Sequence, residues 1–107
     1  MNISSLSNLD FPRYPHSELS NTSVRHAYAK ANAYITLALN ESNIPHDRSQ
    51  KAAAVTDATH NLPENLTAEE YLNHAQMELA TAYSESKEKE FKESLELIRQ
   101  KISQITQ

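Results

Sequence analysis

The sequence predicts an all-α fold: a small bundle of about four helices, built as two helical hairpins, with an irregular N-terminal arm. Gly is absent, whereas an average chain of 107 residues holds about seven, so tight β-hairpins lack their usual turn residue. Val, which strands favour, occurs only at positions 24 and 55. Apolar residues instead recur at three- and four-residue steps, as on one face of a helix. We therefore expect an arm at residues 1–22 and a helical domain at residues 23–107.

The arm is rich in Ser and Asn, and it contains Pro12 and Pro15, which disfavour a helix through its middle. Apolar side chains are spread along it: Ile3, Leu6, Leu9, Phe11 and Tyr14. We expect an extended segment that packs across the helices. Its composition also resembles the Ser- and Asn-rich, charge-poor N-termini of bacterial type III secreted proteins. This resemblance contains no motif, covers about a fifth of the chain and implies export without a classical signal peptide.

The first long helix is expected from Ser23 to about Asn40, with Ser23 or Thr22 as its N-cap. Its broad apolar face is rich in Ala, which permits close helix approach: Val24, Ala27, Tyr28, Ala31, Ile35, Ala38 and Leu39. Residues 40–43 read as a loop. Their Asn residues are candidates for the left-handed C-cap that Gly usually fills.

A second, weaker helix is expected over Asp47–Thr59, after a start marked by Pro45. Its strongest helix-forming part is the run of Ala at residues 52–54. Its apolar face is thin, consisting of Ala52, Val55 and Ala58. The polar, proline-containing residues 61–65 end it.

A helix start at Ala68 is the clearest local signal in the chain. Thr67 can accept a hydrogen bond from a free backbone N–H, and Glu70 can reach back to the N–H of Thr67, which is the capping box. Leu66 and Tyr71 have the spacing of a hydrophobic staple across the same cap.

Two apolar stripes follow this start. The first consists of Leu72, Ala75, Leu79 and Ala82, and the second of Phe91, Leu95, Ile98, Ile102 and Ile105. They are out of phase, so either the chain turns within residues 83–86 or one long helix carries a phase slip. The Ser residues at positions 84 and 86 offer N-caps and favour the turn.

The second stripe is the candidate protein-interaction site. It can form the core of the bundle, or it can form a seam with a partner or with a second copy of the chain. Its 3.5-residue spacing suits a short coiled-coil seam, although two heptads alone are marginal. We name Phe91, Leu95, Ile98, Ile102 and Ile105 as the residues of that site and refer to them as the stripe.

The sequence gives little support for a metal site or a catalytic site. Cys is absent, which excludes disulfides, thiolates and zinc–sulfur sites. Two acid–histidine pairs have helical spacing, Asp57 with His60 and Glu70 with His74, but the second is explained by a surface pair. Residues 46–48, His-Asp-Arg, read as a polar helix start, and no Gly-x-Ser-x-Gly elbow exists without Gly. We predict no metal, no cofactor and no enzymatic activity.

The charge pattern argues against nucleic acid and membrane as partners. The formal net charge is −4, without a long run of one sign. Arg99 and Lys101 lie close together, but Glu93 and Glu96 accompany them. No stretch has the apolar length of a membrane span, and the N-terminus lacks the features of a secretory signal peptide. We expect a cytoplasmic protein, with secretion without a classical signal peptide as the alternative.

These features favour a small acidic helical module that binds another protein or a second copy of itself. Inhibitors, immunity proteins, chaperones and regulatory adaptors are often of this kind, which is an argument by analogy of fold. The binding surface would be the apolar face of the last helix, ringed by charged residues. The alternative function is a secreted effector or a component of a secretion apparatus, with the arm as its export signal.

Overall fold

The computed structural model describes residues 2–9, 11–46 and 62–106, and over these residues the chain is helical and contains no strand. The α-helices are α1 (Thr22–Glu41), α3 (Ala68–Glu85) and α4 (Lys89–Thr106). Two short 3₁₀ helices lie in the arm, η1 (Ile3–Leu6) and η2 (His16–Glu18). The all-α class is confirmed. Three α-helices are described where we predicted about four, and the helix expected over Asp47–Thr59 lies outside the described residues.

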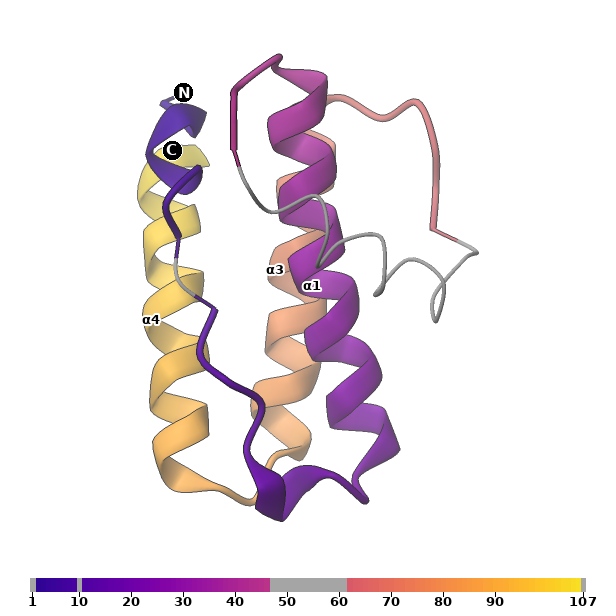
Figure 1. The fold of residues 1–107 in the computed structure, drawn as a ribbon, viewed down its shortest axis with the longest axis vertical. Helices are drawn as coiled ribbons and strands as arrows, with labels where there is room; N and C mark the ends of the chain where they lie inside the picture. The colour runs from indigo at the N-terminus through magenta and orange to yellow at the C-terminus, as the bar shows by residue number, and fades with distance from the viewer. Residues whose placement is uncertain (1, 10, 47–61, 107) are drawn as a thin grey trace.

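The three helices run alternately up and down (Figure 1). Helix α1 packs extensively against the antiparallel α3, and α4 packs mainly against α3. The arm runs along α4 on the side that faces α1. Its first turn, η1, lies beside the C-terminal end of α4, and η2 lies beside the turn between α3 and α4 (Figure 1). The arm therefore takes the place beside α4 that a further helix would take in a four-helix bundle.

Helix α1 begins one residue earlier than we predicted, because Asn21 is its N-cap. The Asn21 side chain accepts a hydrogen bond from the backbone N–H of Val24, with an N···O distance of 3.3 Å. Neither Thr22 nor Ser23 caps the helix, since both lie in its first turn. The Ser23 hydroxyl donates instead to the carboxylate of Glu85 at the end of α3.

The C-terminal end of α1 confirms a left-handed Asn cap. Asn43 has a φ of 56°. The N–H of Asn43 donates to the carbonyl of Asn40 (3.1 Å) and that of Ile44 to the carbonyl of Leu39 (3.0 Å). These two bonds form a Schellman motif, in which Asn replaces the usual Gly. The half-buried Ile44 packs against the core, so the cap also turns the chain back onto the bundle.

The capping box at the start of α3 is confirmed. The N–H of Glu70 donates to Thr67 Oγ1 (3.1 Å), and the N–H of Thr67 donates to Glu70 Oε1 (3.0 Å). Helix α3 starts at Ala68 as predicted. The two apolar stripes belong to separate helices, because α3 ends at Glu85 and the chain turns at residues 86–88. This turn overlaps the expected window, residues 83–86, only at Ser86.

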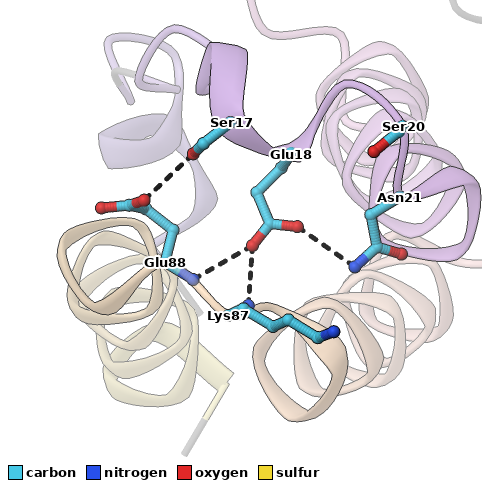
Figure 2. Close-up of a pocket in the computed structure, with 6 residues that line it drawn as sticks. All are labelled: Ser17, Glu18, Ser20, Asn21, Lys87 and Glu88. Carbon is cyan, nitrogen blue, oxygen red and sulfur yellow. Dashed lines mark hydrogen bonds between the residues drawn. The ribbon is translucent and has the colours of Figure 1, made fainter.

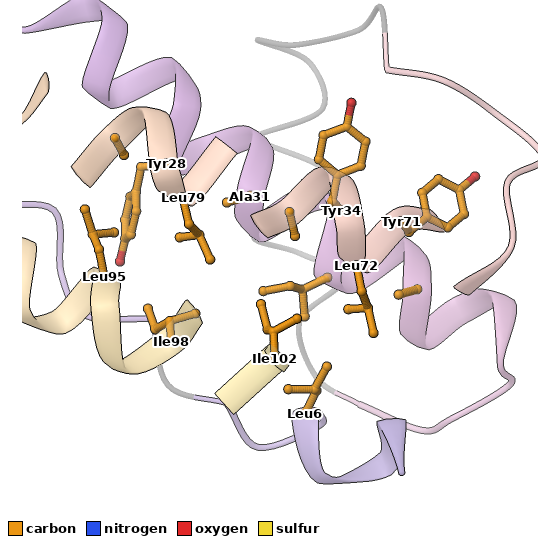
Figure 3. Close-up of a cluster of buried hydrophobic side chains, with 14 of the residues drawn as sticks. Leu6, Tyr28, Ala31, Tyr34, Tyr71, Leu72, Leu79, Leu95, Ile98 and Ile102 are labelled. Atoms are coloured by element: carbon orange, nitrogen blue, oxygen red, sulfur yellow. The ribbon is translucent and has the colours of Figure 1, made fainter. Parts of the chain in front are cut away.

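The core lies between the three helices and also includes Ile3 and Leu6 of the arm; Figure 3 shows Leu6. Eight large side chains in it are fully buried: Leu6, Val24, Ile35, Leu39, Leu72, Leu79, Leu95 and Ile102. Between α1 and α3 several buried residues are Ala, including Ala31 and Ala75, which brings these two helices close together. Leu6 lies near Ile102 at the end where η1 meets α4 (Figure 3).

Candidate functional site

The stripe lies inside the molecule in this structure. Phe91, Leu95, Ile98 and Ile102 are buried, and Ile105 is half-buried at the end of α4. The neighbouring Leu97, one residue out of phase, is 66% exposed. The stripe thus forms core packing, and its further role as an interaction site stays a prediction.

The arm covers the part of the stripe around Phe91 through a cluster of aromatic rings. The Tyr14 ring meets the Phe91 ring edge to face, with centroids 5.4 Å apart. Tyr28 of α1 also meets Phe91 edge to face, at 5.0 Å. Phe11 and Tyr14 both lie against Tyr28, at 5.1 and 5.6 Å. Such pairs contribute about 0.5–1.5 kcal/mol each beyond their buried area.

Residues 11–15, Phe-Pro-Arg-Tyr-Pro, form the middle of the arm, and we call them the strap. Pro15 has φ −68° and ψ 138°, close to the polyproline II helix (about −75° and +145°). The three-residue spacing of Phe11 and Tyr14, whose rings both contact Tyr28, matches that helix, and Arg13 between them is exposed. The Tyr28 hydroxyl donates a hydrogen bond to the carbonyl of Pro12.

Beyond the strap, the arm is held by a carboxylate, which Figure 2 shows. Glu18 is 4% exposed, and its Oε1 accepts a hydrogen bond from the Ser86 hydroxyl (2.8 Å). The same oxygen accepts from the backbone N–H groups of Lys87 (2.7 Å) and Glu88 (3.0 Å), as Figure 2 shows. Its Oε2 accepts from the side-chain amide of Asn21 (3.1 Å). We call this arrangement the latch, because it ties η2 to the turn between α3 and α4.

The electrostatics of the latch favour an ionised Glu18. Burial raises the pKa of this carboxyl, but hydrogen bonds from Ser86, Lys87, Asn21 and Glu88 lower it, and the net pKa lies below the ordinary value of 4.5. The two backbone N–H groups also precede the N-terminus of α4, where the helix dipole favours negative charge. Glu18 therefore binds as an anion to the start of α4.

Two clefts flank the strap. One has a volume of about 540 Å³ and is lined by Arg13, Tyr14, Pro15, His16 and Leu19. The other has a volume of about 370 Å³, and α4 contributes to it; its lining is Pro12, Arg13, Pro15, Ser17, Glu88, Glu90, Phe91 and Ser94. The second cleft thus has an apolar floor beside two carboxylates. Ser17 closes one end of it by donating to Glu88 Oε2 (3.0 Å).

Of the two acid–histidine pairs, only Glu70 and His74 lie within the described residues, and each has another contact. Glu70 belongs to the capping box, where hydrogen bonds from Thr67 lower its pKa. His74 stacks on the ring of Tyr34, with centroids 5.0 Å apart. The described residues contain no group of three or more His, Cys, Asp or Glu that could hold a metal ion. Asp57, His60 and residues 47–48 lie outside the described residues.

Arg99, one of the basic residues of α4, is accompanied by an acidic side chain. Arg99 pairs with Glu96 through Nη1 and Oε2 at 3.0 Å, one turn apart on the same helix. Within the described ranges, no helix has the length and apolar character needed to cross a membrane.

Sequence reasoning missed Glu18, Ser86 and Tyr28 as site residues. One signal was available for Glu18, since it is one of the few charged residues in an arm otherwise rich in Ser and Asn. Nothing in the spacing pairs it with the turn at residues 86–88, which lies about seventy positions away in the chain.

Comparisons with protein-family models, with curated proteins and with solved structures found no match to this chain. The arm, the latch and the stripe are therefore the features from which a function can be inferred.

Proposed function

We propose that this protein is a small acidic protein-binding module that acts through the stripe on α4, of the inhibitor, immunity, chaperone or regulatory adaptor type. One observation supports this proposal above the others. The strap, a non-helical segment of the arm, covers the Phe91 end of the stripe, where a four-helix bundle would place a helix. Such a segment can be replaced by a partner without unfolding α1, α3 or α4.

Burial differs along the arm in a way that suits this exchange. The anchors Leu6 and Glu18 are buried, whereas Leu9, Phe11 and Tyr14 between them are half-buried. Full burial of a large apolar side chain contributes about 1.5–3 kcal/mol, and each aromatic pair adds about 0.5–1.5 kcal/mol. Lifting two half-buried rings and separating their three aromatic pairs therefore costs on the order of 3–7 kcal/mol. A state near the lower end of this range is populated at about 0.1–10%, which is enough for a partner to select.

The latch controls this exchange because the strap has little slack. Helix α4 has 18 residues and is about 27 Å long. The nine residues between η1 and η2, at opposite ends of α4, reach about 30 Å when fully extended. Lifting the strap therefore requires one anchor to let go. Release of Glu18 is the easier route, because release of η1 would expose Ile3 and Leu6.

Site-specific photo-crosslinking in source cells tests the proposal. A benzoylphenylalanine replaces Ser94, which lines the cleft beside the strap, or Met77, which is 67% exposed on α3, outside that cleft. We expect a defined crosslinked product from position 94, stronger in the Glu18→Gln background and absent from position 77. Its mass distinguishes a different protein from a second copy of this chain. No product from position 94, or equal products from both positions, would reject the stripe as the binding surface.

The second candidate function, a secreted effector or secretion component, remains a prediction. In this structure the arm is packed against α4, so an export machinery would first have to unpack it. Cytoplasmic localisation is likewise a prediction.

A further inference from the structure

We propose that the surface beneath the strap is a groove that binds an extended polyproline II segment with a basic residue. In the native protein the strap occupies this groove and competes with that segment for it. We call this surface the seat and define it as Tyr28, Glu88, Glu90 and Phe91. The inference rests on the proposed function and names the chemistry of the partner. It deepens that function, because it replaces an unspecified protein by a segment of defined shape and charge.

The aromatic rings of the seat suit a polyproline II segment in shape. Grooves that bind proline-rich segments are lined by aromatic side chains, which pack against a helix of three residues per turn that is already formed before binding. In the seat, the Tyr28 ring contacts Phe11 and the Phe91 ring contacts Tyr14, and these two strap residues are three apart. The Tyr28 hydroxyl donates to the carbonyl of Pro12, and a polyproline II segment leaves such carbonyls without internal partners. The strap, with Pro12 and Pro15, therefore resembles a proline-rich ligand that is bound by its own chain.

The carboxylates of Glu88 and Glu90 make the rim of the seat acidic. Arg13 lines the same cleft as Glu88 and Glu90, at the end of α4 that lies nearest to the latch. A basic residue between two prolines thus lines the same cleft as two carboxylates, and we infer that this charge complementarity selects both the segment and its direction. An acidic residue at the same place would be repelled. We infer that the partner segment carries Arg or Lys at the position of Arg13.

Competition within the chain explains how such a groove stays closed. A tethered ligand acts at an effective concentration in the millimolar range. A free segment that binds the empty seat therefore binds the native protein much more weakly. Release of the latch lowers this competition without altering the seat itself.

The test uses the full-length chain and a fluorescent peptide with the sequence of residues 9–17, blocked at both ends. The host is the triple variant Phe11→Ala, Tyr14→Ala, Glu18→Gln, which removes the two rings of the strap and weakens the latch so that the strap can lift; its helicity is checked first. We expect saturable binding to this variant, on the order of tenfold or more tighter than to the wild type, because the strap competes less for the seat. If the triple variant does not fold, the double variant Tyr14→Ala, Glu18→Gln serves as host.

Two matched controls make the result specific. A peptide in which both prolines are replaced by Ala should bind several-fold more weakly, because it loses the preformed helix. A peptide with Arg13→Glu should also bind more weakly, and Glu90→Lys in the protein should restore its binding. Nuclear magnetic resonance shifts should be centred on Tyr28 and Phe91. Absence of binding to a folded host, equal binding of the Ala peptide, or shifts centred elsewhere would overturn the inference.

The two proposals fail separately. A crosslinked partner from position 94 without peptide binding would leave the binding function and remove the polyproline groove. Peptide binding without any crosslinked partner would leave the groove and remove the proposed cellular function.

Discussion

Glu18 shows how one carboxylate can hold a segment that has little regular structure. The apolar residues of the arm contribute burial, which has no direction, whereas Glu18 accepts hydrogen bonds from three groups in one turn of the chain. Hydrogen bonds of this kind fix the position of η2 against the start of α4. The latch therefore determines where the C-terminal part of the arm lies along the bundle.

The pH dependence of the free energy of unfolding should show whether ionised Glu18 stabilises the fold. Replacing Glu18 by Gln removes the charge from these hydrogen bonds, so the free energy of unfolding should fall by about 1–2 kcal/mol at pH 7. The folded pKa of Glu18 lies below 4.5, so its stabilisation is present above about pH 4.5 and is lost as the pH falls through the folded pKa. The difference between wild type and variant should therefore shrink below that pH.

Urea unfolding followed by circular dichroism, repeated from pH 7 down to acid, measures this difference. Glu93→Gln is the control, because Glu93 is exposed on α4. A difference that stays constant into acid, or that is absent at pH 7, would contradict the latch.

Asn43 is a second residue whose role depends on its backbone. Its φ of 56° lies in the left-handed region, which Asn tolerates better than most other residues that carry a Cβ. The chain uses Asn at this position and again at Asn65, where φ is 61°. Within the described part of the chain, Asn thus occupies the positive-φ positions of a protein that contains no Gly.

At the scale of elements, α4 depends on the phase of its stripe. Ile98 is 4% exposed, whereas Leu97 beside it is 66% exposed. The two positions differ by about 100° around the helix axis, which is enough to separate the core from solvent. The same side-chain chemistry therefore has opposite energetic consequences one residue apart.

Aspartate substitutions at these two positions should give opposite results. Ile98→Asp buries a carboxyl without a partner and removes core packing, which should cost about 3–5 kcal/mol and unfold most of the protein. Leu97→Asp should leave the melting temperature nearly unchanged. Thermal melts by circular dichroism, with the mass in solution as a second measurement, compare the two. Similar melting temperatures for both variants would show that the stripe has another phase.

At the scale of the whole molecule, the arm takes the place of a further helix beside α4. Helix α4 packs mainly on α3, and the arm packs along its side that faces α1. Ile3 and Leu6 at one end and Glu18 at the other are buried, so the arm belongs to the same cooperative unit as the helices. Loss of the arm should therefore destabilise the entire fold.

Removing residues 1–20 should strongly destabilise the protein. The deletion removes the burial of Ile3 and Leu6 and the latch, which together contribute on the order of 5 kcal/mol. A domain of this size should then melt at least about 20 °C lower or fail to fold. The control is the full chain with Arg13→Ala and His16→Ala, since both side chains are exposed. An unchanged melting temperature after deletion would favour an arm that serves as an export signal.

Local chemistry determined much of this protein. The all-α class follows from the missing Gly and the scarce Val, and the start of α3 follows from Thr67 and Glu70, because a capping box joins residues three apart. The left-handed Asn cap and the phase of the stripe are also local properties, readable from neighbouring positions. The N-cap Asn21 was missed because Thr22 and Ser23 carry equally suitable side chains.

Tertiary structure alone decided the rest. Whether the stripe is core or open seam depends on what covers it, and the arm that covers its Phe91 end is distant in sequence. The latch joins Glu18 to residues 86–88, and the seat joins Tyr28 to Phe91. No periodicity encodes such pairs, because they arise from the packing of one element on another. The candidate site is therefore built from contacts that the sequence specifies only through the complete fold.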